Sequence, residues 1–456
     1  MSCQWFSLQF ISVVLFFASG GFNPIYDKLK NYVFKDTVLS AQDGLKLHFF
    51  TVMQTIREAG QIPFETFANR ISGHPVTFII SLIGYIYLVY RYKIMLLALP
   101  LLGLGFLASV GGLRFTIYAV PVLAFGVAFL ITELSLKMPT KRLKYLSMTA
   151  LTLAILFPNY KHIEAYKVPT VFNADEVAVL DVLKEKADRE DYVVSWWDYG
   201  YPIRYYADVK TLVDGGKHSG EVNFPVSYIL TSPQEEAAKM ARLDVEYTQR
   251  AFRIQDRNQD LNQTQIVRLF SNIEEMTKDY GFDDTNDFLL SLQTDIKLPE
   301  KTRDIYLYLP YKMLYIYPTV KVFSNIDLMS GKNLQRPFMF SSRSFKDLGE
   351  RVQLSSEVFL NKRELVLEIN GKKTPIKRFV KTFYTKNLEF KKDIQLLDFS
   401  AKLNVIYMAA YNTFLILDEQ TYNSLYIQLM VLEDYDKSLF EKVVTNPHAK
   451  VYKLKI

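Results

Sequence analysis

Two tryptophans and an acid stand side by side at Trp196, Trp197 and Asp198, followed by Tyr199 and Gly200. Indole rings supply N–H donors and flat apolar walls, and a carboxylate accepts a hydrogen bond from a hydroxyl group. The three side chains therefore suit a small hydroxyl-bearing group, such as a Ser or Thr side chain. The alternative is an aromatic core in which Asp198 caps the following helix.

The elements that must position these residues begin with a membrane part. Apolar, charge-poor stretches predict about five membrane spans, at roughly 5–21, 75–90, 94–111, 115–134 and 145–158. The first stretch could instead be a signal peptide, but residues 1–21 contain no Lys or Arg, whereas a signal peptide begins with a basic region. We therefore expect it to span the membrane.

The short loops between these stretches indicate the orientation. Basic residues gather in two loops that lie two spans apart: Arg91 and Lys93 in one, and Lys137, Lys141, Arg142 and Lys144 in the other. Because basic loops stay in the cytoplasm, residues 23–74 and everything after 158 are expected outside. Arg114, in the turn 111–114, would also be outside, where that bias does not favour a basic residue. A permanently charged, bidentate guanidinium there suits a lipid-linked pyrophosphate, although simple snorkelling is the alternative.

Residues 159–456 predict a mixed α+β domain outside the membrane. Helical spacing of apolar residues, or a typical helix start, is found at 174–187, 233–257 and 284–293, and residues 191–197 read as a buried strand. Short β-like runs dominate from about 336 onward, and Asn370-Gly371 predicts a hairpin. The expected domains are thus 1–158, with an external loop at 23–74, and 159–456.

Composition excludes several classes of protein. The net charge is only +6, and no run of basic residues suggests binding of nucleic acid. The single cysteine, Cys3, leaves no intramolecular disulfide. No haem, nucleotide or zinc motif is found.

The pentapeptide 196–200 resembles the signature of the catalytic subunit family of oligosaccharyltransferase, in its bacterial single-subunit form. Further stretches resemble the same family: YPIRYYADVKTLVDGGKH, LLALPLLGLGF, GLRFTIYAVPV, TRDIYLYLP and the closing KVYKLKI. The resemblance covers nearly the whole chain. It implies a GT-C-type membrane fold and transfer of an oligosaccharide from a polyprenyl (undecaprenyl) diphosphate to the asparagine of D/E-x-N-x-S/T sequons.

By this resemblance, Trp196, Trp197 and Asp198 bind the Ser/Thr hydroxyl two residues after the acceptor asparagine. Met313 and Ile316 match the family's Met-x-x-Ile element, whose isoleucine packs on the threonine methyl. Without the resemblance, these two residues would be read as an i, i+3 pair facing the core.

The external loop holds two further candidates. Glu58 matches the family's glutamate that coordinates a divalent metal, Mn²⁺ or Mg²⁺, and engages the acceptor amide; such hard cations prefer oxygen ligands. Taken alone, Glu58 is an ordinary solvated acid. Arg70 matches the arginine that pairs with an acid two residues before the acceptor asparagine. Its alternative is an interfacial arginine beside a membrane span.

The resemblance assigns Arg114 to the lipid pyrophosphate and places Tyr201 and His218 near that pyrophosphate or the first sugar. Asn262 stands in the sequon Asp260-Leu261-Asn262-Gln263-Thr264, which carries an acid two residues before the asparagine. It is therefore a candidate glycosylation site, with a chance sequon as the alternative.

The sequence departs from the family upstream of residue 58. Members carry an essential aspartate in a first external loop and an acidic pair in a second, and neither is found there. We therefore expect the C-terminal part of such an enzyme: a fragment, a truncated reading frame, or one half of an enzyme that a second polypeptide completes. We expect it to be inactive by itself and to lie in the bacterial inner membrane, with its soluble domain in the periplasm. The alternatives are a non-catalytic, membrane-anchored sequon-binding protein and a structural membrane protein.

Overall fold

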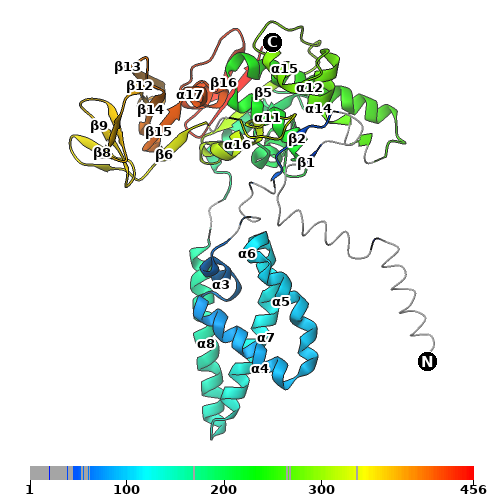
Figure 1. Cartoon of the computed structure of the whole chain (residues 1–456), viewed down its shortest axis with the longest axis vertical. Helices are drawn as coiled ribbons and strands as arrows, with labels where there is room; N and C mark the ends of the chain where they lie inside the picture. The colour runs from blue at the N-terminus through cyan, green and yellow to red at the C-terminus, as the bar shows by residue number, and fades with distance from the viewer. Residues whose placement is uncertain are drawn as a thin grey trace. The chain divides into compact units, whose positions relative to one another are not determined.

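The computed structural model describes residues 20, 38–39, 45–52, 55, 60, 62–167, 170–262, 265–266, 269–334 and 337–456. The chain divides into two compact units (Figure 1). The helical unit comprises Met1–Asp36 and Val52–Thr170, and the soluble unit comprises Thr37–Thr51 and Val171–Ile456. The expected span at 5–21, Cys3 and Glu58 lie outside the described residues.

The helical unit consists of short and long helices joined by tight breaks. Its elements are α3 (Phe64–Ser72), α4 (Pro75–Arg91), the 3-10 helix η3 (Lys93–Ala98), α5 (Leu99–Phe106), α6 (Ala108–Gly111), η4 (Leu113–Phe115), α7 (Thr116–Leu136) and α8 (Lys141–Ala165). In the described part of the chain, Lys93–Gly111 and Leu113–Leu136 are long and apolar enough to cross a membrane. The pair α3 and α4, bent by 67°, passes the same test only if it is counted as one span.

The predicted number of membrane spans, about five, is therefore not confirmed. The stretches 94–111 and 115–134 match the two apolar segments, and 75–90 lies in the bent pair. The stretch 145–158 does form a helix, α8, but this helix is not apolar enough to count as a span. Its apolar run is short because polar and basic residues flank it: Lys141, Arg142 and Lys144 before it, and Asn159 and Lys161 after it.

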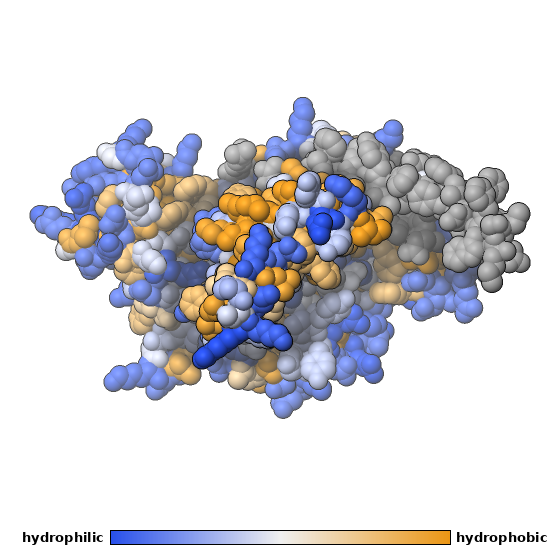
Figure 2. All heavy atoms as spheres, turned by 90° about the horizontal axis from the view of Figure 1, so that it is seen from below, coloured by the Kyte–Doolittle hydropathy of each residue, from blue (hydrophilic) through white to orange (hydrophobic). Residues whose placement is uncertain are grey.

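Apolar side chains on the outside of the helical unit agree with a lipid environment. Leu97 is 78% exposed, Ile117 is 67% exposed and Phe125 is 64% exposed. On the face drawn in Figure 2, apolar side chains gather over the helices of this unit. A protein surrounded by water rarely exposes so many large apolar groups together, because each contact with water is unfavourable.

Close contact between α4 and α7 depends on two glycines. A Cβ atom on Gly126 would lie 2.4 Å from the backbone nitrogen of Tyr85, and one on Gly84 would lie 2.3 Å from the carbonyl oxygen of Gly126. Small residues at such crossings let helix backbones approach each other, which is how helices associate in lipid.

The soluble unit is built on a five-stranded sheet in the order β16-β17-β5-β3-β4. Its strands are β3 (Tyr192–Val194), β4 (Lys210–Thr211), β5 (Ile305–Pro310), β16 (Phe440–Thr445) and β17 (Ala449–Leu454). Strands β4, β3 and β5 run parallel, while β16 and β17 complete the sheet in antiparallel pairs. Every residue of β5 is buried, as expected for a strand covered on both faces.

Helices surround this sheet, and three of the seven that the structure describes were predicted from the sequence. They are α9 (Ala174–Lys184), α10 (Gly200–Ala207), α11 (Gly220–Thr231), α12 (Gln234–Arg257), α14 (Asn272–Asp279), α15 (Thr285–Ser291) and α16 (Tyr317–Ser324). The helices predicted at 174–187, 233–257 and 284–293 correspond to α9, α12 and α15. Local signals account for these: a capping box of Asn173 with Glu176 opens α9, and Pro233 precedes α12.

Residues 339–418 form two further five-stranded sheets, as the short β-like runs predicted. One sheet has the order β11-β10-β9-β8-β7 and the other β13-β12-β14-β15-β6. The strands are β6 (Met339–Ser342), β7 (Lys346–Asp347), β8 (Arg351–Gln353), β9 (Val358–Asn361), β10 (Val366–Ile369), β11 (Lys372–Thr374), β12 (Ile376–Tyr384), β13 (Phe390–Leu396), β14 (Leu403–Met408) and β15 (Thr413–Asp418); α17 (Glu419–Tyr422) and the π-helix Ile427–Val431 follow. The hairpin at Asn370-Gly371 is confirmed, with φ of 51° and 75° at these residues.

A short segment that is distant in sequence also belongs to the soluble unit. Strand β2 (His48–Phe49) pairs with β1 (Val38–Leu39), and the backbone N–H of His48 donates to the carbonyl oxygen of Leu328 at 2.7 Å. Phe49 is buried and meets Phe224 of α11 edge-on, with ring centroids 6.2 Å apart. Part of the predicted external loop 23–74 is thus a component of the soluble unit.

Candidate functional site

Three candidate segments follow strands of the central sheet and begin at the same end of those strands. Strands β4, β3 and β5 are parallel, so their carboxyl ends lie together. Trp196–Asp198 follow β3, the loop to His218 follows β4, and Met313–Ile316 follow β5. Loops at the carboxyl ends of parallel strands are the usual place for a ligand site in such sheets.

The tryptophan pair divides into a buried and an accessible member. Trp196 is only 1% exposed and packs edge-on against Phe323 of α16, with ring centroids 5.1 Å apart. Trp197 is half-buried and stacks on the His218 ring at 5.1 Å. Asp198 is exposed in the 3-10 helix η5 (Trp197–Tyr199). Trp197, Asp198 and His218 are therefore the members of this group that a ligand can reach.

The glycine that ends the pentapeptide brings two loops together. A Cβ atom on Gly200 would lie 2.5 Å from both the Asp214 Cβ atom and the Val213 carbonyl oxygen. Asp214 in turn fixes the turn before His218, because its Oδ1 accepts hydrogen bonds from the backbone N–H groups of Gly216 and Lys217 at 2.8 and 2.9 Å. The close approach of the two loops is what allows Trp197 and His218 to stack.

Tyr201 lies beside the same turn. A Cβ atom on Gly215 would lie 2.6 Å from the Tyr201 ring, and one on Gly216 would lie 2.6 Å from the Tyr201 hydroxyl oxygen. Tyr201 is 54% exposed, so a ligand can reach this residue. Arg204, one helical turn further along α10, forms an ion pair with Asp214 at 2.8 Å. This ion pair also holds α10 against the turn that contains Asp214.

Met313 and Ile316 lie in and just after the 3-10 helix η6 (Tyr311–Tyr315). Met313 is fully buried, whereas Ile316 is half-buried. Of the two, only Ile316 offers surface to a peptide in this structure.

Two candidate arginines belong to the helical unit. Arg70, in the last turn of α3, lies over the Tyr166 ring at 3.6 Å and donates a hydrogen bond to the Tyr166 hydroxyl. Arg114 is exposed in η4, directly after a break at Gly112, whose φ is 100°. This left-handed region favours glycine, so Gly112 explains how the chain turns and projects Arg114.

The described residues contain no group of three or more His, Cys, Asp or Glu side chains that could hold a metal ion. The candidate ligand Glu58 lies outside those residues, and its carboxylate is of the type that Mn²⁺ and Mg²⁺ prefer. Asn262 is exposed, and its Oδ1 accepts a hydrogen bond from the backbone N–H of Gln265 at 2.9 Å.

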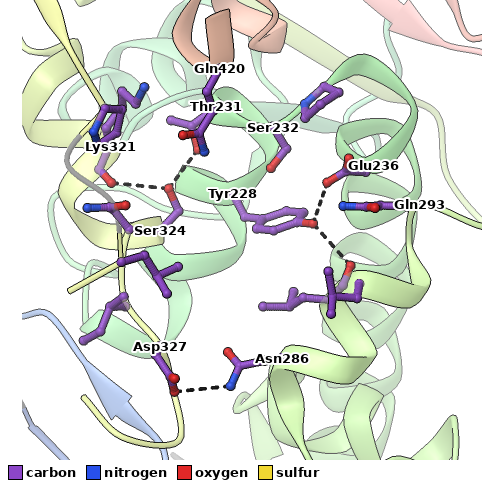
Figure 3. A pocket seen from close by; sticks show the side chains of 17 residues that line it. Tyr228, Thr231, Ser232, Glu236, Asn286, Gln293, Lys321, Ser324, Asp327 and Gln420 are labelled. Carbon is purple, nitrogen blue, oxygen red and sulfur yellow. Dashed lines mark hydrogen bonds between the residues drawn. The ribbon is translucent and has the colours of Figure 1, made fainter. Parts of the chain in front are cut away.

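Sequence reasoning missed a cavity of about 670 Å³ in the soluble unit (Figure 3). Tyr228 of α11 donates a hydrogen bond to Glu236 of α12 at 2.9 Å, and Asn286 donates to Asp327 at 3.2 Å. Burial raises the pKa of the Glu236 carboxyl and lowers the pKa of Lys321 to about 8. Since these residues come from four separate segments, no local pattern in the sequence could have grouped them.

Comparisons with known proteins agree with this geometry. The STT3/PglB/AglB core domain model matches residues 189–330, and the STT3/PglB C-terminal beta-barrel domain model matches residues 338–417. Two undecaprenyl-diphosphooligosaccharide–protein glycotransferases, from two strains of Campylobacter jejuni, are each 41% identical, with 98% of this chain and 62% of each relative covered. The crystal structure of the C. jejuni PglB C-terminal domain is 39% identical, covers 62% of this chain and 100% of that domain, and gives a TM-score of 0.53.

The fold and these matches define a membrane protein with a soluble domain of the oligosaccharyltransferase type. The chain belongs to the STT3/PglB family. It spans 62% of the length of the Campylobacter relatives.

Proposed function

We propose that this chain takes part in N-linked glycosylation, the transfer of an oligosaccharide from a polyprenyl diphosphate to the asparagine of D/E-x-N-x-S/T sequons. The observation that carries the proposal is the Trp197–His218 stack beside exposed Asp198, at the edge where three parallel strands end. The substrates are a lipid-linked oligosaccharide and acceptor proteins. The enzyme works in the bacterial inner membrane, with about five spans and with residues 159–456 as a periplasmic domain.

In the proposed site, the acceptor peptide lies on the accessible side of this group. Asp198 accepts a hydrogen bond from the Ser or Thr hydroxyl, Trp197 forms one wall, and Ile316 packs on the threonine methyl. Trp196 and Met313, being buried, support that surface from behind. Arg70 pairs with the acid two residues before the asparagine. Holding the peptide in one geometry removes much of the entropic barrier to reaction.

The proposed reaction forms a bond between the asparagine amide nitrogen and the anomeric carbon, while the bond from that carbon to the pyrophosphate oxygen breaks. The nitrogen loses a proton, and the polyprenyl diphosphate leaves. Arg114 stabilises the negative charge on the departing pyrophosphate, and Tyr201 and His218 contact the pyrophosphate or the first sugar. Glu58 is the proposed ligand of a divalent ion, Mn²⁺ or Mg²⁺, which when bound adds positive charge near the pyrophosphate.

The test is binding of a fluorescent Asp-x-Asn-x-Thr peptide to the purified chain, beside an Asp-x-Asn-x-Ala control. We expect binding that requires the threonine, and Trp197→Ala should abolish the difference between the two peptides. Equal binding of both peptides by the unaltered chain would contradict the proposal. The chain alone is expected to be inactive, so transfer from a lipid-linked oligosaccharide, measured in parallel, would overturn that expectation and exclude the second candidate, a membrane-anchored protein that only binds sequons.

Asn262 provides a prediction of its own. Its side chain is exposed and its sequon has the acidic form, so we propose that it is glycosylated in cells that hold an active enzyme of this family. The mass of the peptide that contains Asn262 should then increase by one glycan. An unshifted mass in such cells would refute the prediction, and Asn258, exposed but outside any sequon, is the control.

A further inference from the structure

An arginine stacked on a tyrosine lies directly beside the proposed acceptor surface. The guanidinium carbon of Arg343 is 3.7 Å from the centroid of the Tyr315 ring. Tyr315 is the last residue of η6 and immediately precedes Ile316. Arg343 directly follows β6, whose Ser342 pairs with Phe414 of β15 and donates a side-chain hydrogen bond to the Leu354 carbonyl at 2.6 Å. The backbone on both sides of this contact is therefore held by the fold.

Two more tyrosines support Tyr315 from behind. Tyr315 meets Tyr311 edge-on with ring centroids 5.5 Å apart, and Tyr311 stacks on Tyr411 at 3.7 Å with an interplanar angle of 12°. The Tyr311 hydroxyl also lies 3.1 Å from the Thr413 hydroxyl. We call Arg343, Tyr315, Tyr311 and Tyr411 the Arg–Tyr platform. Residues from three chain segments meet in this platform.

The charge on this platform is uncompensated within the part of the chain that the structure describes. Arg343 is exposed, and no described carboxylate lies within ion-pair distance of it. By contrast, the neighbouring Lys312 is paired with Glu176 at 2.8 Å. A guanidinium stacked on a ring keeps its N–H edges free, and those edges match a carboxylate with two parallel hydrogen bonds.

We propose that Arg343 on the Arg–Tyr platform selects acceptor segments that carry an acidic side chain within four residues after the sequon threonine. This inference rests on the proposed function, in which Ile316 meets that threonine. The residues before the threonine are engaged by other proposed contacts, so the chain that passes Tyr315 is the part that follows. An extended chain advances about 3.4 Å per residue, and the next few residues therefore reach the platform.

The experiment uses the whole chain and a set of fluorescent Asp-x-Asn-x-Thr peptides that carry Glu, Gln or Lys at one of the four following positions. At one or more of these positions, Glu should bind about three- to fivefold more tightly than Gln, the range of a well-placed exposed ion pair. Lys should bind more weakly than Gln. The preference should shrink in high salt, because the platform is exposed.

Arg343→Gln should remove the preference and leave binding of the Gln peptide unchanged. Arg343→Glu should reverse it in favour of Lys, which provides a gain of binding that a misfolded variant cannot show. Arg351→Gln is the matched control, since Arg351 also lies over a ring, that of Phe359 at 5.6 Å, on another sheet.

The outcomes separate the two proposals. If the Asp-x-Asn-x-Ala control binds as well as the threonine peptide, the proposed function fails. If threonine is required but Glu, Gln and Lys peptides bind alike, or if a Glu preference survives Arg343→Gln, only the role of Arg343 is overturned.

Discussion

At the residue scale, burial decides what each side chain can do. The two adjacent tryptophans look equivalent in sequence, yet Trp196 is enclosed against Phe323 while Trp197 is half-open on His218. The same distinction separates Met313 from Ile316. Residue types and spacing identified the candidates, but the position of each relative to the surface depends on neighbours more than a hundred positions away in some cases.

Lys321 gives a prediction about pH at this scale. Burial lowers its pKa to about 8 in the folded protein, from a usual value of 10.5. Between these two values the unfolded chain binds more protons than the folded one, so the contribution of Lys321 to stability rises as pH increases through that window. Lys321→Met should remove this rise and lift the free energy of unfolding near pH 7 by about 1–3 kcal/mol.

The measurement is denaturant unfolding of the full chain in detergent between pH 7 and 10, compared between variant and parent. Lys332→Met, at an exposed lysine close in sequence, should leave the pH dependence unchanged. Equal slopes in the Lys321→Met variant and the parent would show that Lys321 is not the titrating group.

At the element scale, the helical unit depends on backbone contact rather than on apolar side chains alone. Periodicity and hydropathy predicted where most helices run, because those signals are local. The contact of α4 with α7 at Gly84 and Gly126 was not predicted, since pairing of helices is not encoded within either helix. The predicted span at 145–158 is not confirmed, because polar residues on both sides shorten its apolar run.

Gly126→Ala tests this contact. The added methyl group would lie 2.4 Å from the Tyr85 backbone nitrogen and 2.6 Å from the Ser81 carbonyl oxygen, so the two helices must move apart. Such overpacking should cost about 1–3 kcal/mol and lower the melting temperature in detergent. The matched control is Gly103→Ala in α5, where a Cβ atom meets nothing within 4 Å. A melting temperature for Gly126→Ala at or above that of the control would rule the contact out as a stabilising feature.

At the scale of the whole molecule, a segment from the N-terminal part of the chain completes the soluble unit. Leu47 and Phe49 are buried there, and Gly220 approaches the Phe50 backbone so closely that a Cβ atom would lie 2.3 Å from its carbonyl oxygen. The segment thus links the predicted external loop to α11, the helix that follows the His218 loop.

Phe49→Ala should release this segment. Removing a buried phenylalanine side chain typically costs about 3–5 kcal/mol, so amide hydrogen exchange should accelerate in residues 45–51 and in the first turns of α11. Lys46→Ala, at an exposed position of the same segment, should leave exchange unchanged. Unaltered protection in the Phe49→Ala variant would mean that the segment is held by its backbone hydrogen bonds alone.

Local features of the chain were enough to predict the family, the division into a membrane part and an α+β part, the helices at 174–187, 233–257 and 284–293, and the hairpin at Asn370-Gly371. These follow from composition, periodicity and short motifs, all of which act over a few residues. Three features were visible only in the folded chain: Trp197 stacks on His218, Arg343 stacks on Tyr315, and β2 joins the soluble unit. Those contacts depend on the order of strands in the sheets and on which surfaces become buried, and both are set by packing between segments far apart in the chain.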